Sequence, residues 1–451
     1  MSVAETTISQ IEQFVGDWVT EANVPGASIA ISHEGELVYA SGFGSRDLDT
    51  NEPATADTLY GVASVSKSFA ALGVLILEER GELSVADSVN QYLPELSLDD
   101  EAEPITIHEL LTHSSGVPSL KTSEVLLSRL TDIEELGVPL GDREDFYRHV
   151  NGATNERTDE DYVMYNNSGY ILLGQLIEEL TGQQFAGFIE EEILSPLGMT
   201  RSTFDPGAMD DDAMTPHLLR DGVPEATPFP HRELSYAAGG LLSSVTELTN
   251  YLLMNQNGGS YEGAEILPAD RLAKAHEGHV PRAGNEYGYG WERTQVGDRL
   301  MVGHGGSLGV SSSYVGFTPD GAYTIAIGAN TLPSPTPPTV AEGILALLGG
   351  KTPSETVPYY KRKSLFEELT GEYESYRGIT QATVEEHGGV LQLTTEHTLD
   401  NQSLLLIPTD PEDPGYEFEI PTETGVRKSA TFEPHEEHVD LFYDRNRLHK
   451  R

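Results

Sequence analysis

The sequence predicts an α/β (α+β) unit over residues 1–350, followed by a small all-β domain over residues 364–451, with a linker at 351–363. Three observations predict this organisation. Apolar residues at helical spacing fill the middle of the chain, strand-like segments lie at both ends of the first unit, and period-two alternation marks the C-terminal part. Strands at both ends of a unit, with helices between them, favour one sheet completed by both ends of that unit.

The strand-like segments lie where this architecture needs them. Residues 27–31 and 36–40 are separated by HEG at 33–35, a pattern typical of a hairpin. At the other end of the unit, strands are expected at 300–302, 313–317 and 323–327. Between these ends, helices are expected at 107–111, 169–180, 185–193 and 245–255, and a last helix at 339–348.

A further helix, expected over residues 64–80, differs from the others in its pattern. It carries apolar residues on two faces, as a helix buried on both sides does. Gly81 follows it and supplies the left-handed residue that commonly ends a helix. We therefore expect this helix to lie inside the core.

The C-terminal part has a different character. Residues 351–363 contain Pro353 and Pro358 and are interpreted as a linker. Beyond them, apolar and acidic residues alternate at 416–420 (YEFEI) and 439–443 (VDLFY). Such alternation predicts a small antiparallel β domain with one buried and one solvated face.

Composition excludes several classes of protein. The chain of 451 residues has 38% hydrophobic residues and no cysteine, so disulfides, thiolate nucleophiles and cysteine-based zinc sites are excluded. It has no run of about 18 apolar residues that could cross a bilayer, and its first residues lack a secretory signal pattern. We therefore expect a cytoplasmic protein without a membrane partner.

The charge balance is strongly acidic. There are 73 acidic and 27 basic residues, a net charge of −46, and only eight lysines. Such a surface repels phosphate backbones, so we expect no nucleic-acid partner. Together with the absence of cysteine, this composition resembles that of proteins from salt-loving archaea. We interpret the carboxylates as a solvated, halophilic surface.

The first chemical motif is S-x-x-K at residues 64–67. Three residues along a helix bring Ser64 and Lys67 onto one face, where a hydroxyl and an amine can share a proton. A helix N-terminus and burial both lower the pKa of a lysine, which allows it to act as a base. This is the only S-x-x-K in a chain that avoids lysine. The alternative is a helix-capping serine beside a lysine that reaches solvent.

Two further motifs place polar groups where a cleft could form. Tyr165 and Asn167 lie on a turn rich in small polar residues that leads into the helix at 169–180, although Asn167 or Ser168 could simply cap that helix. His304-Gly305-Gly306 lies on or beside a strand, where glycines often mark the close approach of a ligand or another backbone. A bulge or a sheet corner is the alternative there.

In this order, S-x-x-K, Y-x-N and H-x-G, the motifs resemble those of the penicillin-recognising serine hydrolases. This superfamily includes the class C β-lactamases, D-alanyl-D-alanine peptidases and their esterase relatives. The resemblance covers about residues 8–350. Other markers of the same resemblance are VPG at 24–26, LLTHSSG at 110–116, PLGM at 196–199 and AGGL at 238–241.

The resemblance implies a β-lactamase-like fold, with an antiparallel sheet flanked by helices and a mostly helical subdomain. It implies that Ser64 is the acylated nucleophile and that Lys67 is its proton partner. Tyr165 would be a second acid or base, acting on the leaving group and on the water of deacylation. The backbone N–H groups of Ser64 and Ser307 would form the oxyanion hole.

The same resemblance implies that Asn167, His304, Gly306 and Ser307 bind substrate, with Asn167 orienting an amide. One position departs from many penicillin-binding members, which carry K-T-G in the third motif where this chain has His304-Gly305-Gly306. That difference weakens the case for recognition of a β-lactam carboxylate but leaves the serine hydrolase interpretation intact. In the C-terminal part, residues 369–373 (LTGEY) resemble the lipocalin-like barrel of archaeal peptidases of this group. A generic β accessory domain is the alternative.

Three other patterns point to chemistry that we do not expect. GGSLG at 305–309 matches the nucleophile motif of α/β-hydrolases, but strand-like sequence follows it where that fold needs a helix. His108 and His113 are five residues apart, about 140° around a helix, and cannot hold one ion. His435 and His438 are three apart, and on a strand they would point to opposite faces.

The sequence therefore predicts a hydrolase that cleaves an amide or ester of a small-molecule or peptide substrate through an acyl-Ser64 intermediate. We expect it to need no cofactor and no metal. An inactive binding module with the same fold, a true β-lactamase and a metal-dependent hydrolase are the alternatives. The sequence leaves the substrate and a homo-oligomeric state open.

Overall fold

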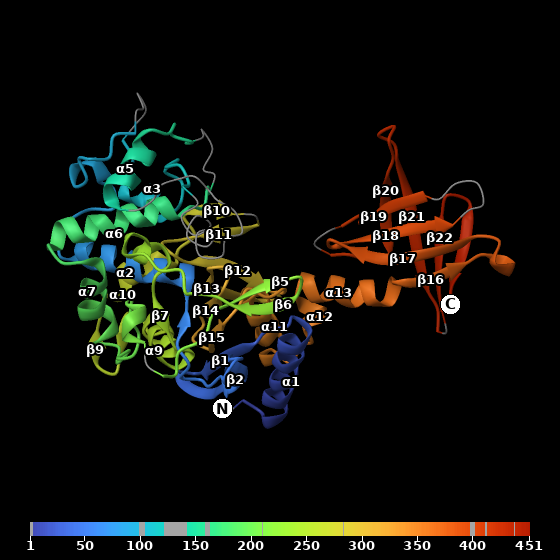
Figure 1. Cartoon of the computed structure of the whole chain (residues 1–451), viewed down its shortest axis with the longest axis horizontal. Coiled ribbons are helices and arrows are strands. Elements are labelled where there is room, and N and C mark those ends of the chain that lie inside the picture. The colour runs from blue at the N-terminus through green and yellow to red at the C-terminus, as the bar shows by residue number, and fades with distance from the viewer. Residues whose placement is uncertain are drawn as a thin grey trace. The chain divides into compact units, whose positions relative to one another are not determined.

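A computed structural model of the protein describes residues 3–98, 104–120, 142–157, 163–209, 211–282, 284–396, 402–410, 413–436 and 438–451. The chain forms two compact units, Met1–Ala341 and Glu342–Arg451 (Figure 1). The first contains a large antiparallel sheet with helices, and the second a closed all-β barrel. The predicted fold class is confirmed.

The sheet of the first unit is completed by both of its ends, as predicted. Its nine strands follow the order β10-β11-β12-β13-β14-β15-β1-β2-β3. The N-terminal strand β1 pairs antiparallel with the late strand β15, with Ile29 opposite Ile327. The strands are β1 (Gly26–His33), β2 (Glu36–Asp47), β3 (Glu52–Pro53), β10 (Val280–Arg282), β11 (Asn285–Tyr287), β12 (Glu292–Val296), β13 (Arg299–Ser307), β14 (Ser312–Phe317) and β15 (Tyr323–Ala329).

Helices pack on this sheet and on one another. Helix α9 contacts β1, β14 and β15, and helix α1 contacts β2. The helices are α1 (Glu5–Glu21), α2 (Ser66–Glu79), α3 (Ile107–Leu111), α5 (Arg143–Asn151), α6 (Asn167–Thr181), α7 (Phe185–Ile189), α8 (Tyr236–Gly239), α9 (Val245–Gln256), α10 (Ala269–His276) and α11 (Pro337–Leu348). Short two-stranded pairs are β4 (Tyr60–Gly61) with β7 (Leu242–Ser243), β5 (His217–Arg220) with β6 (Val223–Ala226), and β8 (Ser260–Tyr261) with β9 (Ala264–Glu265).

Helix α2 is the buried helix that the sequence predicts. Every residue from Ser66 to Leu77 is buried, and α2 contacts α6, α7, α8 and α10. Gly81 follows with a φ of 73°, the left-handed conformation expected at the end of a helix. The helix begins later than predicted, because residues Ala63–Val65 form a 3-10 turn in front of it.

The second unit is a barrel of eight strands in sequence order, closed by pairing of its first and last strands, β16 and β23. Alternate residues such as Phe418 and Ile420 fill its interior together with Leu365, Phe366 and Leu369 of helix α13. The strands are β16 (Gly371–Glu374), β17 (Gln381–His387), β18 (Val390–Glu396), β19 (Gln402–Pro408), β20 (Glu417–Pro421), β21 (Arg427–Pro434), β22 (Val439–Tyr443) and β23 (Asn446–Lys450).

The residues interpreted as a linker are largely helical. They form α12 (Pro353–Thr356) and the first half of α13 (Pro358–Leu369). Both prolines stand near the start of a helix, where the missing N–H costs nothing, and Thr352 with Glu355 makes a capping box.

One expectation about the barrel is wrong. His435 and His438 do not share a strand, because β21 ends at Pro434 and β22 begins at Val439. The N–H of His435 donates to the carbonyl of His438 at 2.8 Å, which closes the turn between the two strands. The two imidazole rings therefore stack on each other, with centroids 4.7 Å apart, instead of pointing to opposite faces.

Within the described part of the chain, no helix combines the length and the apolar character needed to cross a lipid bilayer.

Candidate active site

Ser64 stands on a strained turn at the entrance to the buried helix. The preceding residue, Ala63, has a φ of 49°, a conformation that residues with a Cβ rarely adopt. The strain persists because the surroundings hold this backbone on both sides. The Ser66 hydroxyl donates to the Ala63 carbonyl at 2.7 Å, and the Ser313 hydroxyl of β14 donates to the Val62 carbonyl at 2.7 Å. Strained backbone of this kind clusters at functional sites.

The amine of Lys67 lies completely buried beside this serine. Its Nζ is 2.9 Å from the Ser64 Oγ, 2.8 Å from the Asn167 Oδ1 and 2.6 Å from the carbonyl oxygen of Ala238. Burial, helped by the positive charge of Arg282, holds the pKa of Lys67 well below its usual value.

These contacts can orient the amine in its neutral form, which the lowered pKa of Lys67 favours. The oxygens of Asn167 and Ala238 can only accept hydrogen bonds, so each takes one of the two N–H groups of the neutral amine. The remaining partner is the hydroxyl of Ser64, to whose Oγ the Lys67 Nζ donates in this arrangement; loss of that proton frees the nitrogen lone pair for the proton of the serine. An amine held in this way is arranged to take the serine proton.

The side chain of Asn167 is available to Lys67 because its neighbour caps the helix. The sequence left Asn167 or Ser168 as the cap of α6, but the structure gives this role to Asn166, whose Oδ1 accepts the N–H of Gly169 at 2.9 Å. Asn167 becomes the first residue of the helix, and its amide reaches the lysine instead.

Tyr165 lies on the same segment and packs beside the lysine. The Nζ of Lys67 lies 4.9 Å from the centre of the Tyr165 ring, and the guanidinium of Arg282 lies at the same distance. Burial raises the pKa of Tyr165, and this effect outweighs the hydrogen bond to Ser64 that lowers it. The phenol therefore keeps its proton near neutral pH and can act as a hydrogen-bond donor.

His304, expected among the substrate-binding residues, is buried behind this surface. It is 2% exposed, and its Nδ1 lies 2.6 Å from the Gly305 carbonyl, to which it must donate. Its Nε2 is therefore an acceptor and receives the hydroxyl proton of Tyr287 at 3.1 Å. Burial and the nearby Lys67 lower the pKa of His304 to about 3, so the ring is neutral.

The hydrogen bonds continue through His113 in one direction. The N–H of Asn166 donates to the Nδ1 of His113 at 3.4 Å, which leaves the His113 Nε2–H to donate to the Tyr287 oxygen at 3.2 Å. Burial holds the pKa of His113 well below its usual value, so this ring is also neutral. The chain from Asn166 to Gly305 thus joins the segment of the second motif to the strand of the third.

The glycines of the third motif allow strand β13 to lie against the turn that carries the serine. A Cβ on Gly306 would come within 2.1 Å of the Val62 carbonyl oxygen, so no other residue fits without moving the backbone. The close approach packs strand β13 against the Ala63–Val65 turn that contains Ser64. Strand β14 follows β13, which excludes the α/β-hydrolase interpretation of residues 305–309.

Comparison with known proteins identifies the architecture. Residues 9–349 match the family described as Beta-lactamase, and residues 353–449 match the Pab87 octamerisation domain. The chain belongs to the beta-lactamase family. Members of this family, which includes the penicillin-binding proteins, are generally serine hydrolases.

Individual relatives agree with this assignment. A solved structure of an octameric penicillin-binding protein homologue from Pyrococcus abyssi matches with a TM-score of 0.88 and 32% identity, over 98% of this chain and 100% of that one. Protein flp of Staphylococcus aureus (strain N315) is 28% identical over 71% of this chain. Penicillin-binding protein 4* of Bacillus subtilis (strain 168) is 30% identical over 39% of this chain and 37% of its own length. The chain spans 62% of the length of protein flp.

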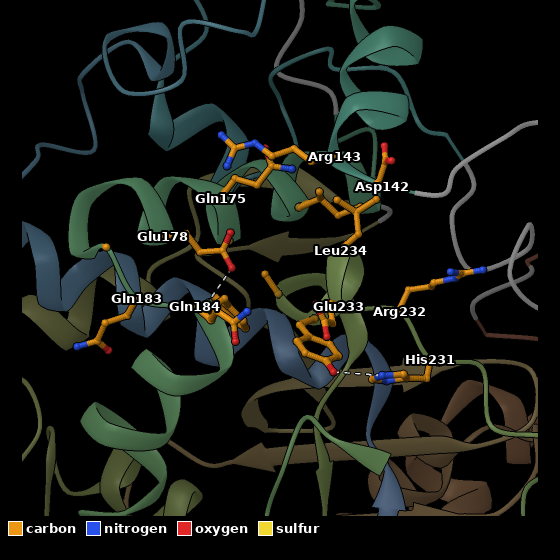
Figure 2. A pocket seen from close by; sticks show the side chains of 16 residues that line it. Asp142, Arg143, Gln175, Glu178, Gln183, Gln184, His231, Arg232, Glu233 and Leu234 are labelled. Carbon is orange, nitrogen blue, oxygen red and sulfur yellow. Dashed lines mark hydrogen bonds between the residues drawn. The ribbon is translucent and has the colours of Figure 1, made fainter. Parts of the chain in front are cut away.

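The structure also contains a cavity that no motif predicted. A small pocket beside Asn167 is lined by His231 and Arg232, and both residues also line a larger cavity of about 700 Å³. Figure 2 shows Gln175 and Glu178 of α6 on the wall of this cavity, with the segment that carries Glu233 and Leu234 opposite.

Gln175 is the unusual residue of this cavity. It is 5% exposed, and among the described residues neither its amide nitrogen nor its amide oxygen has a hydrogen-bond partner. A buried amide without partners costs about 1–3 kcal/mol, so such groups are rare unless something else binds them.

Sequence reasoning missed several residues of the site. His113 was counted only as a structural histidine, and although it lies in the LLTHSSG marker, nothing local showed that it contacts Tyr165 with ring centroids 4.3 Å apart. Tyr287, Arg282 and Glu292 carry no motif at all. Arg282 forms an ion pair with Glu292, and the arginine lies over the rings of Tyr165 and Tyr287.

The burial and lowered pKa of Lys67 predict the effect of Lys67→Arg. An arginine keeps its proton at any ordinary pH and cannot accept the one from Ser64, so kcat/KM on an activated ester should fall by at least about 100-fold. In the unmodified protein, kcat/KM should decrease as the pH falls through the lowered pKa of Lys67, because the amine becomes protonated.

The matched control is Lys274→Arg. Lys274 is a half-exposed lysine of α10 that pairs with Glu78 of α2, and the variant should keep full activity. Wild-type activity in Lys67→Arg would show that the lysine acts only through its charge.

Proposed function

We propose that this member of the beta-lactamase family is a serine hydrolase that cleaves an amide or ester bond through an acyl-Ser64 intermediate. One observation carries the proposal: the buried Lys67 Nζ lies 2.9 Å from the Ser64 Oγ, and its two other partners, the Asn167 Oδ1 and the Ala238 carbonyl oxygen, can only accept hydrogen bonds. Within the described part of the chain this amine has no carboxylate partner, and its burial lowers its pKa.

In the first half of the reaction, the Ser64 oxygen attacks the carbonyl carbon and its proton passes to Lys67. The carbonyl oxygen becomes an oxyanion, which the backbone N–H groups of Ser64 and Ser307 stabilise. Tyr165 donates its proton to the leaving amine or alcohol as the bond to the carbonyl carbon breaks. The nearby charges of Lys67 and Arg282 stabilise the phenolate until a proton returns from Lys67.

In the second half, water attacks the acyl-Ser64 carbonyl and gives a proton to the Tyr165 oxygen, while Tyr165 passes its own proton to the neutral Lys67. Lys67 then returns that proton to the Ser64 oxygen as the bond to the acyl carbon breaks and the acid product leaves. The raised pKa of Tyr165 supports a role as acid in the resting enzyme, because the phenol holds a proton to give. His304 supports the site from behind, through the hydrogen-bond chain that contains Tyr287.

Hydrolysis is favoured over simple binding because Ser64, Lys67 and Tyr165 lie together with hydrogen-bonding geometry. A peptide or ester is favoured over a β-lactam because the third motif supplies no cation for a substrate carboxylate. His304 stands where other members have a lysine, and its neutral ring is buried.

Ser64→Ala should abolish turnover and covalent labelling by a fluorophosphonate, because in the described part of the chain Ser64 is the serine whose hydroxyl contacts the Lys67 amine. Intact-mass spectrometry measures the labelling, and peptide mapping locates the adduct on Ser64 in the unmodified protein. The variant should keep its circular dichroism spectrum and melting temperature, since Ser64 is only half-buried. An adduct of equal yield in the variant would assign the nucleophile elsewhere.

The cavity beside the site suggests which part of a substrate is recognised. We propose that it receives an extended, amide-containing group, whose N–H and C=O satisfy the Gln175 side chain, while Arg232 lines both the small pocket and the larger cavity. A peptide offers this pattern and a short ester does not.

Gln175→Leu keeps the side-chain size and removes the amide. We expect a drop of at least about 5-fold in kcat/KM for a peptide amide, unchanged kcat/KM for a short ester, and a melting temperature that is equal or higher, because an unpartnered buried amide is removed. Gln183→Leu is the control, since Gln183 lines the same cavity but bonds to Glu191 and is exposed. Equal losses on both substrates would exclude a subsite at Gln175.

We also propose that the barrel unit mediates homo-oligomerisation. It matches an octamerisation domain, and the Pyrococcus abyssi homologue, similar over the whole chain, is octameric. Static light scattering should give the mass of about eight chains in molar KCl, where salt screens repulsion between chains of net charge −46. A single-chain mass in both low and high salt would contradict the proposal.

A further inference from the structure

A cluster of imidazoles surrounds one carboxylate on the barrel, away from the residues that fill its interior. Along β22, Val439 and Leu441 belong to the hydrophobic core of the barrel, so Asp440 between them faces outward. An outward carboxylate is normally solvated, yet the Asp440 side chain is 0% exposed. Histidines from three positions of the chain cover it, namely His435, His438 and His449.

We propose that His435, His438 and Asp440 bind a first-row divalent metal ion of the zinc type. The three residues lie on one short stretch, because the β21–β22 turn brings both histidines over the first residues of β22. Their ligand atoms all lie within 4.8 Å of one another, the one such group found in the described part of the chain.

The distances fit metal coordination. Ligands at about 2.1 Å from a tetrahedral zinc ion are about 3.4 Å from each other. The Nε2 of His435 is 3.2 Å from Asp440 Oδ2, and the Nε2 of His438 is 3.4 Å from Asp440 Oδ1. The two rings are half-exposed on a turn, so a small rotation can close the remaining distance between their nitrogens.

The other two partners of Asp440 serve as outer groups that hold the carboxylate. His449 lies opposite Asp440 on β23 and bonds to Oδ1 through its Nδ1 at 2.5 Å, and Arg447 donates to Oδ2 at 2.6 Å. A carboxylate has about four lone-pair positions, so these bonds leave room for a metal ion. Carboxylates that bind metals are usually held by such outer hydrogen bonds.

The donor set selects the class of metal. Imidazole nitrogen suits zinc, nickel, cobalt and copper, whereas magnesium and calcium prefer oxygen ligands. This distinction matters in a chain with 73 acidic residues, whose carboxylates attract hard cations without specificity. A site with two imidazoles can take zinc in the presence of excess magnesium.

The test is titration of the full-length protein with ZnCl₂ by isothermal calorimetry in excess MgCl₂ and molar KCl, with CoCl₂ absorption as a second readout. We expect one ion per chain and the visible bands of four-coordinate cobalt. His435→Ala and His438→Ala should each abolish this binding, and His449→Ala should weaken it by about 10–100-fold, as loss of an outer partner does.

His387→Ala is the matched control, because His387 is an exposed histidine at another hairpin of the same barrel and should leave zinc binding unchanged. Circular dichroism checks that each histidine variant folds. The proposal is overturned if zinc shows no stoichiometric binding, or if His435→Ala and His438→Ala bind it as tightly as the unmodified chain. Those outcomes would leave Asp440 as a carboxylate neutralised by Arg447 and His449.

Discussion

The burial of a single amine organises the first unit. Lys67 lies on a helix with no exposed surface along most of its length, and no carboxylate is paired with it in the described contacts. Charging a group at this depth is expensive, so the environment favours the free base. The features around it, from the acceptor oxygens of Asn167 and Ala238 to the strained backbone at Ala63, hold that amine beside the hydroxyl of Ser64.

The chain of hydrogen bonds through His113, Tyr287 and His304 has a complementary role. It contains two neutral imidazoles whose tautomers are both fixed by backbone groups, one by the N–H of Asn166 and one by the carbonyl of Gly305. Neither ring can reverse without losing a buried hydrogen bond. The segments that carry the second and third motifs are thereby held at a fixed separation. A site that positions a tyrosine and a strand edge around one serine requires such a fixed separation.

Much of this could be predicted from the sequence. The buried helix, the hairpin at the N-terminus, the closing strands and the three motifs all follow from local patterns, and the structure contains each of them. The role of Asn167 was harder to predict, because three adjacent polar residues could each cap the helix. Only the structure shows that Asn166 is the N-cap residue. Tyr287 could not be found at all, since pairing of β11 with β12 and of β12 with β13 brings it to the site.

The failures have physical causes too. His435 and His438 were treated as strand residues, but they lie between the end of β21 and the start of β22, which reverses the conclusion about where their rings point. The capping pair Thr352 and Glu355 indicates a helix that starts at Pro353, but the two prolines of this segment led to its interpretation as a linker. Gln175 looks like any polar residue on a helix, and its isolation becomes visible only when the surrounding cavity is known.

The pairing of β1 with β15 also affects how the protein folds during its synthesis. The centre of the sheet joins residues 26–33 to residues 323–329, so the ribosome must deliver nearly the whole first unit before this sheet can form. Until then β1 has its neighbour β2 on one side and an open, apolar edge on the other, which is a site for unwanted association. Long sequence separation between paired strands also slows folding. The net charge of −46 opposes such association between growing chains, because like charges repel each other.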